Sequence, residues 1–112
     1  MPEVFVSGAF NDLRSRDVRF LQEAGLLGNL TIVLWDDESF HRLMGRLPEF
    51  PQAERLYMLE AIRYVNRVVL ADGPVEPEIE RIRPDIYLVN ADGDRPEKQE
   101  FCRKHNLQYV VL

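Results

Sequence analysis

Five short and nearly continuous apolar runs divide this chain of 112 residues. They cover residues 4–6, 30–35, 67–71, 85–89 and 107–112. Runs of this length, rich in valine, isoleucine and leucine, are typical of strands that are buried on both faces of a parallel sheet. The pattern therefore predicts five strands.

The stretches between the first runs carry apolar residues at helical spacing. Val18, Leu21 and Ala24 predict a helix that follows the first strand. After the second strand, Asp36 or Asp37 has the side chain to cap a short helix that extends to about residue 44.

The later stretches continue this alternation. The spacing of apolar residues within 52–64 predicts a longer helix. We expect a single helical turn over 77–82 and a last helix that begins near Pro96 and ends at about His105. Asp94 has a side chain that suits the N-cap of that last helix.

Strands that alternate with helices predict one α/β domain of Rossmann-like, three-layer architecture with a five-stranded parallel sheet. In such sheets, ligands bind beyond the carboxyl ends of the strands, where the winding reverses. This rule indicates four stretches in which a ligand could bind, at residues 7–17, 35–37, 71–73 and 90–94.

Charge and composition narrow the classes of partner. The net charge of −5, from 14 lysine and arginine residues against 19 acidic ones, argues against broad binding to nucleic acid. No apolar run approaches the roughly 18 residues that a membrane span requires, and residues 1–10 lack a signal-peptide pattern. Cys102 is the only cysteine, so we expect a small buried side chain rather than a disulfide. Together these features predict a cytoplasmic protein without membrane or nucleic-acid partners.

The stretch GAFNDLRSRD, residues 8–17, joins the first strand to the first helix. A glycine-containing turn that leads into a helix suits the binding of a phosphate, because backbone N–H groups are free at a helix start. The alternative is a capped helix start, in which Ser15 is the N-cap and Asp17 satisfies N–H groups of the first turn. Both interpretations stay open from these residues alone.

This stretch and two later ones resemble the cytidylyltransferase-like nucleotidyltransferase superfamily, most closely its glycerol-3-phosphate cytidylyltransferase type. That family has G-x-F-D-x-x-H-x-G-H after its first strand, where this chain has residues 8–17. Residues 54–73, ERLYMLEAIRYVNRVVLADG, are similar to the family's helix arginine and third strand. Residues 83–94, RPDIYLVNADGD, are similar to its fourth strand and the acidic loop that follows.

The resemblance implies transfer of a nucleotidyl group from a nucleoside triphosphate, CTP or ATP with Mg²⁺, to a small phosphorylated acceptor. In the family, the two motif histidines contact the triphosphate. Arg14 and Asp17 replace them here, and Arg16 replaces the glycine between them. Arginine can hold a phosphate, but a carboxylate opposes the charge that develops as pyrophosphate leaves. If each lost contact is worth about 2.7–4 kcal/mol, the standard mechanism is lost or impaired.

The resemblance also implies which residues bind the nucleotide and its phosphates. They come from the loops after the first, second and fourth strands and from the helix over 52–64: Gly8, Ala9, Phe10, Arg14, Arg16, Arg46, Arg55, Asn90 and Asp92. For Arg55 the alternative is a structural pair with Glu54 or a neighbouring acid. No metal ligand is predicted, because Asp92 and Asp94 are explained by a solvated turn.

The resemblance further implies a domain that covers residues 1–112 and lacks the family's C-terminal phosphate-binding helix, since the sequence stops at Leu112. Apolar surface that such a helix would cover favours association, so we expect a homodimer, which the resemblance also implies. Two functions stay open. One is an enzyme, or the relic of one, that transfers a nucleotidyl group. The other is a non-catalytic module that binds a nucleotide or sugar phosphate, or serves regulation or assembly.

Overall fold

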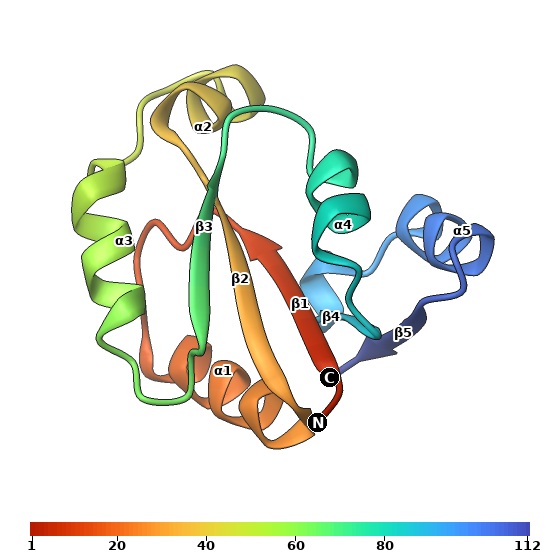
Figure 1. Cartoon of the computed structure of the whole chain (residues 1–112). Coiled ribbons are helices and arrows are strands. Elements are labelled where there is room, and N and C mark those ends of the chain that lie inside the picture. The colour runs from red at the N-terminus through yellow and green to blue at the C-terminus, as the bar shows by residue number, and fades with distance from the viewer.

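Five parallel strands form one sheet in the computed structural model, which describes residues 1–112 (Figure 1). The strands are β1 (Glu3–Gly8), β2 (Asn29–Trp35), β3 (Arg67–Ala71), β4 (Ile86–Val89) and β5 (Gln108–Val111). Their order across the sheet is β3-β2-β1-β4-β5. Each predicted strand is present, with ends that agree within two residues. The α/β class and the parallel five-stranded sheet are therefore confirmed.

Five α-helices connect the strands, and a short 3-10 helix follows β4. They are α1 (Ser15–Leu27), α2 (Asp37–Met44), α3 (Gln52–Glu60), α4 (Glu76–Ile82), η1 (Ala91–Gly93) and α5 (Pro96–Lys104). The helix predicted over 52–64 ends earlier, at Glu60. Ile62 and Val65 donate their N–H groups to carbonyls three residues back, so the chain tightens into turns there.

Helix caps agree with the sequence in one case and differ in another. Asp36 is the N-cap of α2, and its carboxylate accepts a hydrogen bond of 2.8 Å from the N–H of Ser39. The N-cap of α5 is Arg95, so the prediction of Asp94 is wrong. The Asp94 carboxylate instead accepts a hydrogen bond of 2.8 Å from the hydroxyl of Tyr109, on β5.

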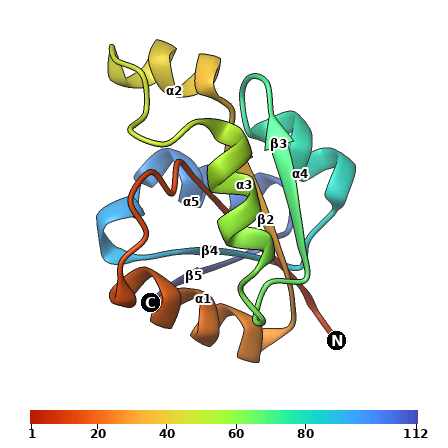
Figure 2. The same ribbon diagram turned by 90° about the vertical axis from the view of Figure 1, so that its left-hand side faces the viewer.

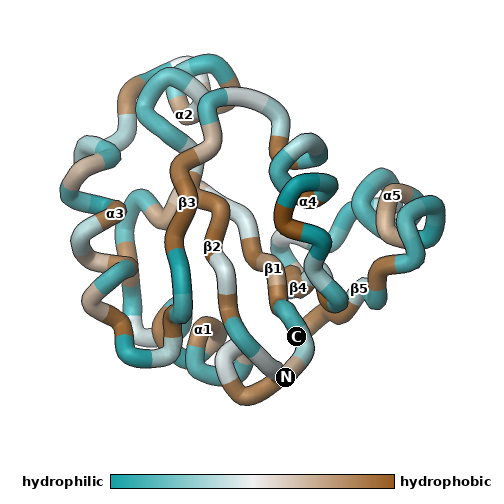
Figure 3. The backbone as a smooth tube through the Cα atoms, viewed as in Figure 1, coloured by the Kyte–Doolittle hydropathy of each residue, from teal (hydrophilic) through white to brown (hydrophobic).

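The helices cover both faces of the sheet and create two separate cores. On one face lie α1 and α3 (Figure 2). Leu21 of α1 and Leu59 of α3 pack there in a cluster with Val4 and Val6 of β1. On the other face, residues of α4 and α5 pack with Phe5. Successive residues of β1 thus enter opposite cores, which explains why its apolar run is continuous. Figure 3 shows hydrophobic residues along the central strands and mostly hydrophilic ones in the loops.

Cys102 belongs to the second core, as predicted. Its side chain is buried, and this burial raises the pKa of the thiol. No helix of the structure is long and apolar enough to cross a membrane.

The direction of winding reverses beside β1. The chain passes from β1 to β2 and β3 on one side, and then returns to place β4 against the other side of β1. The carboxyl ends of β1 and β4 are therefore the switch point of this sheet, where ligands bind in folds of this class.

Candidate functional site

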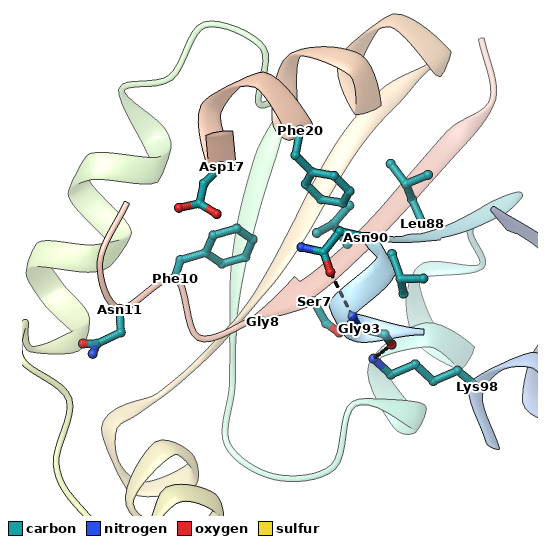
Figure 4. Close-up of a pocket in the computed structure, with 12 residues that line it drawn as sticks. Ser7, Gly8, Phe10, Asn11, Asp17, Phe20, Leu88, Asn90, Gly93 and Lys98 are labelled. Carbon is teal, nitrogen blue, oxygen red and sulfur yellow. Dashed lines mark hydrogen bonds between the residues drawn. The ribbon is translucent and has the colours of Figure 1, made fainter. Parts of the chain in front are cut away.

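A cavity of about 280 Å³ opens at the carboxyl ends of β1 and β4 (Figure 4). We call it the switch-point cavity. The β1–α1 connection, the start of α1 and the β4–α5 connection supply its lining: Val6, Ser7, Gly8, Phe10, Asn11, Asp17, Phe20, Leu88, Val89, Asn90, Gly93 and Lys98. Its place in the topology is the one at which a doubly wound sheet binds its ligand.

Gly8 and Phe10 shape the wall formed by the loop after β1. A Cβ atom on Gly8 would lie 3.2 Å from Cε2 of Phe10, so glycine gives the ring room beside the strand end. Phe10 has a φ of 46°, in the left-handed region that residues other than glycine rarely adopt. Its ring and that of Phe20 pack against the first core and form the apolar part of the cavity wall. Backbone strain of this kind clusters at binding sites.

Asn11 connects this loop to the segment that precedes α3. Its side-chain oxygen accepts a hydrogen bond of 2.8 Å from the N–H of Glu49. Asn11 also lines the switch-point cavity, although the sequence did not single it out. Its bond joins segments that are 38 residues apart, so no local pattern could have indicated it.

The start of α1 is self-capped. Arg14 is the N-cap, and its N–H donates a hydrogen bond of 2.8 Å to a carboxylate oxygen of Asp17. The prediction of Ser15 as the N-cap is therefore wrong, because Ser15 is already the first helical residue. Asp17 has the predicted capping role, and it lines the switch-point cavity as well. A carboxylate thus stands where the resembled family has its second histidine.

The Arg14 side chain lies away from the cavity. Its Nε and Nη2 atoms donate to the same carboxylate oxygen of Asp12, at 3.1 and 2.7 Å, and its side chain is 69% exposed. The hydrogen bond and the charge of Asp12 raise the pKa of Arg14. Arg46 is exposed too, with its guanidinium carbon 5.4 Å from the centre of the Phe40 ring. Neither arginine lines the switch-point cavity.

Arg55 is buried, and its guanidinium donates hydrogen bonds to groups of the protein itself. Its guanidinium donates to the carbonyl oxygens of Phe50, Ala9 and Trp35 at 2.7–2.9 Å. It also forms an ion pair of 2.8 Å with Asp37, rather than with Glu54. Four of the five guanidinium N–H groups have protein acceptors, so Arg55 has the structural role and lies outside the cavity wall.

Two further cavities adjoin the switch-point cavity. One, of about 350 Å³, lies beside α1 and is lined by Arg16, Arg19 and Asp92, among others. The other, of about 300 Å³, lies between α2, α4 and α5 and includes Trp35 and Phe101. We call them the α1-side and α4-side cavities. Each shares lining residues with the switch-point cavity, so the three form one groove along the carboxyl ends of the strands.

The loop after β4 forms the wall opposite Asp17. The Asn90 side-chain oxygen accepts a hydrogen bond of 2.9 Å from the N–H of Gly93. Lys98 donates from Nζ to the carbonyl oxygen of Gly93 at 2.8 Å, and partial burial together with the charge of Arg95 lowers the pKa of Lys98. The sequence did not predict Lys98. Its one local signal is a cation in the first turn of a helix, where the helix dipole disfavours positive charge.

Acidic residues outnumber basic ones in the groove, by five to three. The switch-point cavity has one cationic residue, Lys98, and one acidic residue, Asp17. In the α1-side cavity two arginines face three acidic residues. No group of three or more histidine, cysteine, aspartate or glutamate side chains is arranged to hold a metal ion.

The predicted residues thus fall into three sets. Gly8, Phe10 and Asn90 line the switch-point cavity, and Arg16 and Asp92 line the adjoining α1-side cavity. The remaining ones lie outside both: Ala9, Arg14, Arg46 and Arg55. The groove can therefore accommodate an organic phosphate, but few cations face it.

Two FAD synthases match nearly the whole chain. The chain is 33% identical over 116 residues to the FAD synthase of Aciduliprofundum boonei, and the match covers 100% of the chain and 77% of that protein. It is 32% identical over 114 residues to the FAD synthase of Thermococcus kodakarensis, with 97% and 76% covered. No protein-family model matches the chain.

Two further matches extend this set. The bifunctional protein HldE of Syntrophotalea carbinolica is 36% identical over 92 residues, which are 80% of the chain and 19% of that protein. The crystal structure of the lipopolysaccharide core biosynthesis protein from Thermoplasma volcanium superimposes with a TM-score of 0.87 at 26% identity. That alignment covers 100% of the chain and 96% of the other, so the two share their whole fold.

Proposed function

The chain belongs to the cytidylyltransferase-like nucleotidyltransferase superfamily, and on this premise we propose that it binds a nucleotide in the groove, with nucleotidyl transfer impaired. One observation supports the proposal: a cavity lies at the switch point of the sheet, and Asp17, which stands at the motif position of the family's second histidine, lines it.

The groove has room for a nucleotide and a second molecule. Its three adjoining cavities each have volumes of about 280–350 Å³, in the range of small-molecule sites. An enzyme named FAD synthase makes FAD, which consists of the phosphorylated acceptor FMN joined to the adenylyl group of ATP. ATP and FMN are therefore the first ligands to test, followed by CTP and sugar phosphates.

Impaired transfer follows from the positions of the two residues that replace the motif histidines. Arg14 is paired with Asp12 and exposed, so it does not supply the lost positive charge inside the cavity. Asp17 brings a negative charge to the wall. Removal of one electrostatic contact to a developing oxyanion costs about 2.7–4 kcal/mol in the transition state. With both contacts changed, we expect transfer to be slow.

Magnesium would come with the nucleotide. Mg²⁺ keeps several water ligands and is commonly bound through one or two carboxylates plus substrate phosphates. Only Asp17 provides a carboxylate in the switch-point cavity. This donor set suits Mg²⁺ that is carried by a triphosphate, and it does not suit a metal site made by the protein alone.

A non-catalytic binding module is the second candidate, because the same carboxylate that slows transfer does not prevent binding of a nucleoside or a monophosphate. Calorimetry and product analysis separate the two. We expect the wild-type protein to bind ATP or CTP in the presence of Mg²⁺ and to form FAD from ATP and FMN slowly. Binding without formation of any FAD would instead support the non-catalytic module. If neither ATP nor CTP binds, the proposal is wrong.

Restoring the motif gives a sharper test. Combined Arg14→His, Arg16→Gly and Asp17→His changes recreate the family's charge pattern. If Asp17 and Arg14 limit transfer, the variant should turn over ATP and FMN, or CTP and a sugar phosphate, about 10²-fold faster than the wild type. Arg63→His, on an exposed residue outside the groove, is the control. A wild-type rate equal to that of the restored variant would show that transfer is not impaired.

A further inference from the structure

Lys98 occupies the wall shared by the switch-point cavity and the α4-side cavity. It lies in the first turn of α5, and Figure 4 shows its side chain beside Gly93. An ammonium group has three N–H donors, but Nζ makes one hydrogen bond, to the carbonyl oxygen of Gly93. None of the protein's ion pairs includes Lys98.

This is an unfavourable place for a cation without a partner. The N-terminal end of a helix carries partial positive charge, which disfavours a nearby ammonium group. Arg95, three residues before Lys98, adds a further positive charge, which the nearby Asp94 offsets only in part, and the Lys98 side chain is partly buried. Each of these effects would be offset by an anion bound in the groove, where two N–H groups of Lys98 remain without protein acceptors.

Lys98 is also the only lysine, arginine or histidine that lines either cavity. An anionic group bound at the junction of the two cavities can therefore form an ion pair with Lys98 and with no other cationic side chain. Two carboxylates, Glu76 and Glu97, line the α4-side cavity beside apolar and aromatic groups such as Trp35 and Phe101. They disfavour a second anionic group there, so a ligand with one phosphate and an uncharged body fits this part of the groove.

We propose that Lys98 binds the phosphate of a phosphate monoester whose uncharged, largely apolar body lies in the α4-side cavity. The inference rests on the proposed nucleotide-binding function and assigns the phosphate contact of the second ligand to α5. The start of α1, which the motif comparison favoured, does not supply this contact. Arg14 is paired with Asp12, and Arg16 lines the α1-side cavity but neither of the two cavities that meet at Lys98.

The chain offers a direct measurement, because Lys98 and Lys104 are its only lysines. Lysine labelled with ¹³C at Cε and ¹⁵N at Nζ, incorporated during expression, makes both visible in NMR spectra and leaves their N–H groups unchanged. Phenyl phosphate, a monoester with an uncharged apolar body, is the probe. Its titration should shift the Lys98 signals and leave those of Lys104, on the exposed end of α5, unchanged. Unmoved Lys98 signals at concentrations that saturate binding would overturn the inference.

Substitution of Lys98 tests the same contact in a second way. Lys98→Gln removes the charge but keeps an N–H donor for the Gly93 carbonyl oxygen. We expect phenyl phosphate to bind this variant about tenfold more weakly or worse, as for a lost charged hydrogen bond. Lys104→Gln is the matched control and should bind as the wild type does. Thermal unfolding of both variants verifies that they are folded.

The outcomes separate this inference from the proposed function. If ATP binds the wild-type protein and phenyl phosphate binds Lys98→Gln as tightly as wild type, the inference is wrong and the proposed function stands. If the wild type binds neither ATP nor phenyl phosphate, both are wrong. Weaker binding of 3-phosphoglycerate than of phenyl phosphate would further support the inference about Lys98, because Glu76 and Glu97 would repel the second anionic group of 3-phosphoglycerate.

Discussion

At the residue scale, Arg55 holds together segments that surround the groove. Its buried guanidinium bonds to Ala9 in the loop after β1, to Trp35 at the end of β2 and to Phe50 before α3. The ion pair with Asp37 adds the first turn of α2. A single side chain thus fixes the relative positions of the loops whose strand ends bound the groove. The family motif predicts that this arginine binds phosphate, and in the structure its guanidinium is bonded to the protein itself.

Replacement of Arg55 tests that role. Arg55→Met keeps much of the side-chain volume but leaves Asp37 and three carbonyl groups without their donor. Loss of one partner of a buried ion pair costs about 3–5 kcal/mol of unfolding free energy, and the partial exposure of Asp37 places this case near 3 kcal/mol. Urea unfolding measures the loss, with Glu54→Gln on the exposed side of α3 as the control. Equal midpoints for Arg55→Met and Glu54→Gln would contradict this role.

At the element scale, the junction of α1 and β2 sets the register of the central strands. Gly28 ends α1, and the next residue, Asn29, donates its N–H to the carbonyl oxygen of Pro2 at 2.8 Å. This bond precedes the pairing of Glu3 with Asn29 that continues along β1 and β2. A Cβ atom on Gly28 would lie 2.1 Å from the Pro2 oxygen, so only glycine permits this close approach.

Gly28→Ala should therefore destabilise the protein, although the extended backbone of Gly28 suits any residue. The added methyl group must displace the Pro2 backbone, and overpacking of this kind costs about 1–3 kcal/mol or more. Gly73→Ala is the matched control, because no atom lies within 4 Å of the added Cβ there. Its effect should stay within about 0.5 kcal/mol. Thermal or urea unfolding of the two variants decides the comparison, and similar stabilities would contradict the packing argument.

At the scale of the whole molecule, several large apolar side chains remain exposed, and among them are two groups whose members lie close together in the sequence. Leu43, Met44, Leu47 and Phe50 are exposed between the middle of α2 and the start of α3, with Leu47 at 68%. Val111 and Leu112 are exposed at the end of β5. Exposed apolar side chains that gather in one region favour association. They are the surfaces through which a homodimer would form.

We expect light scattering to give twice the chain mass of 13.1 kDa at micromolar concentrations. A charged substitution in the contact should return the protein to a monomer. Leu47→Glu and Val111→Glu test the two regions separately, and Leu26→Glu, at an exposed leucine on α1, is the control. A monomeric mass for the wild-type protein across this range would contradict the homodimer.

Local sequence patterns are enough to predict the helices and strands, their order along the chain and the place of the groove. The spacing of apolar residues reflects which face of a helix or strand is buried, and this spacing can be seen within a short stretch of sequence. It therefore predicted all five strands and the helices between them. The rule for the carboxyl ends of parallel strands then indicated the cavity that Gly8, Phe10, Asp17 and Asn90 line. The motif identified the superfamily as well.

Which of the candidate side chains face that cavity depends on contacts between distant parts of the chain. Arg14, Arg46 and Arg55 have the same charge in the sequence, but Asp12, the Phe40 ring and a set of buried carbonyl groups hold them elsewhere. Lys98 lines the cavity because β4 pairs with β1, and this pairing brings the start of α5 close to the carboxyl end of β1. The orientation of a charged side chain depends on partners that are distant along the chain. For this reason the sequence located the groove, and only the fold showed which cation faces it.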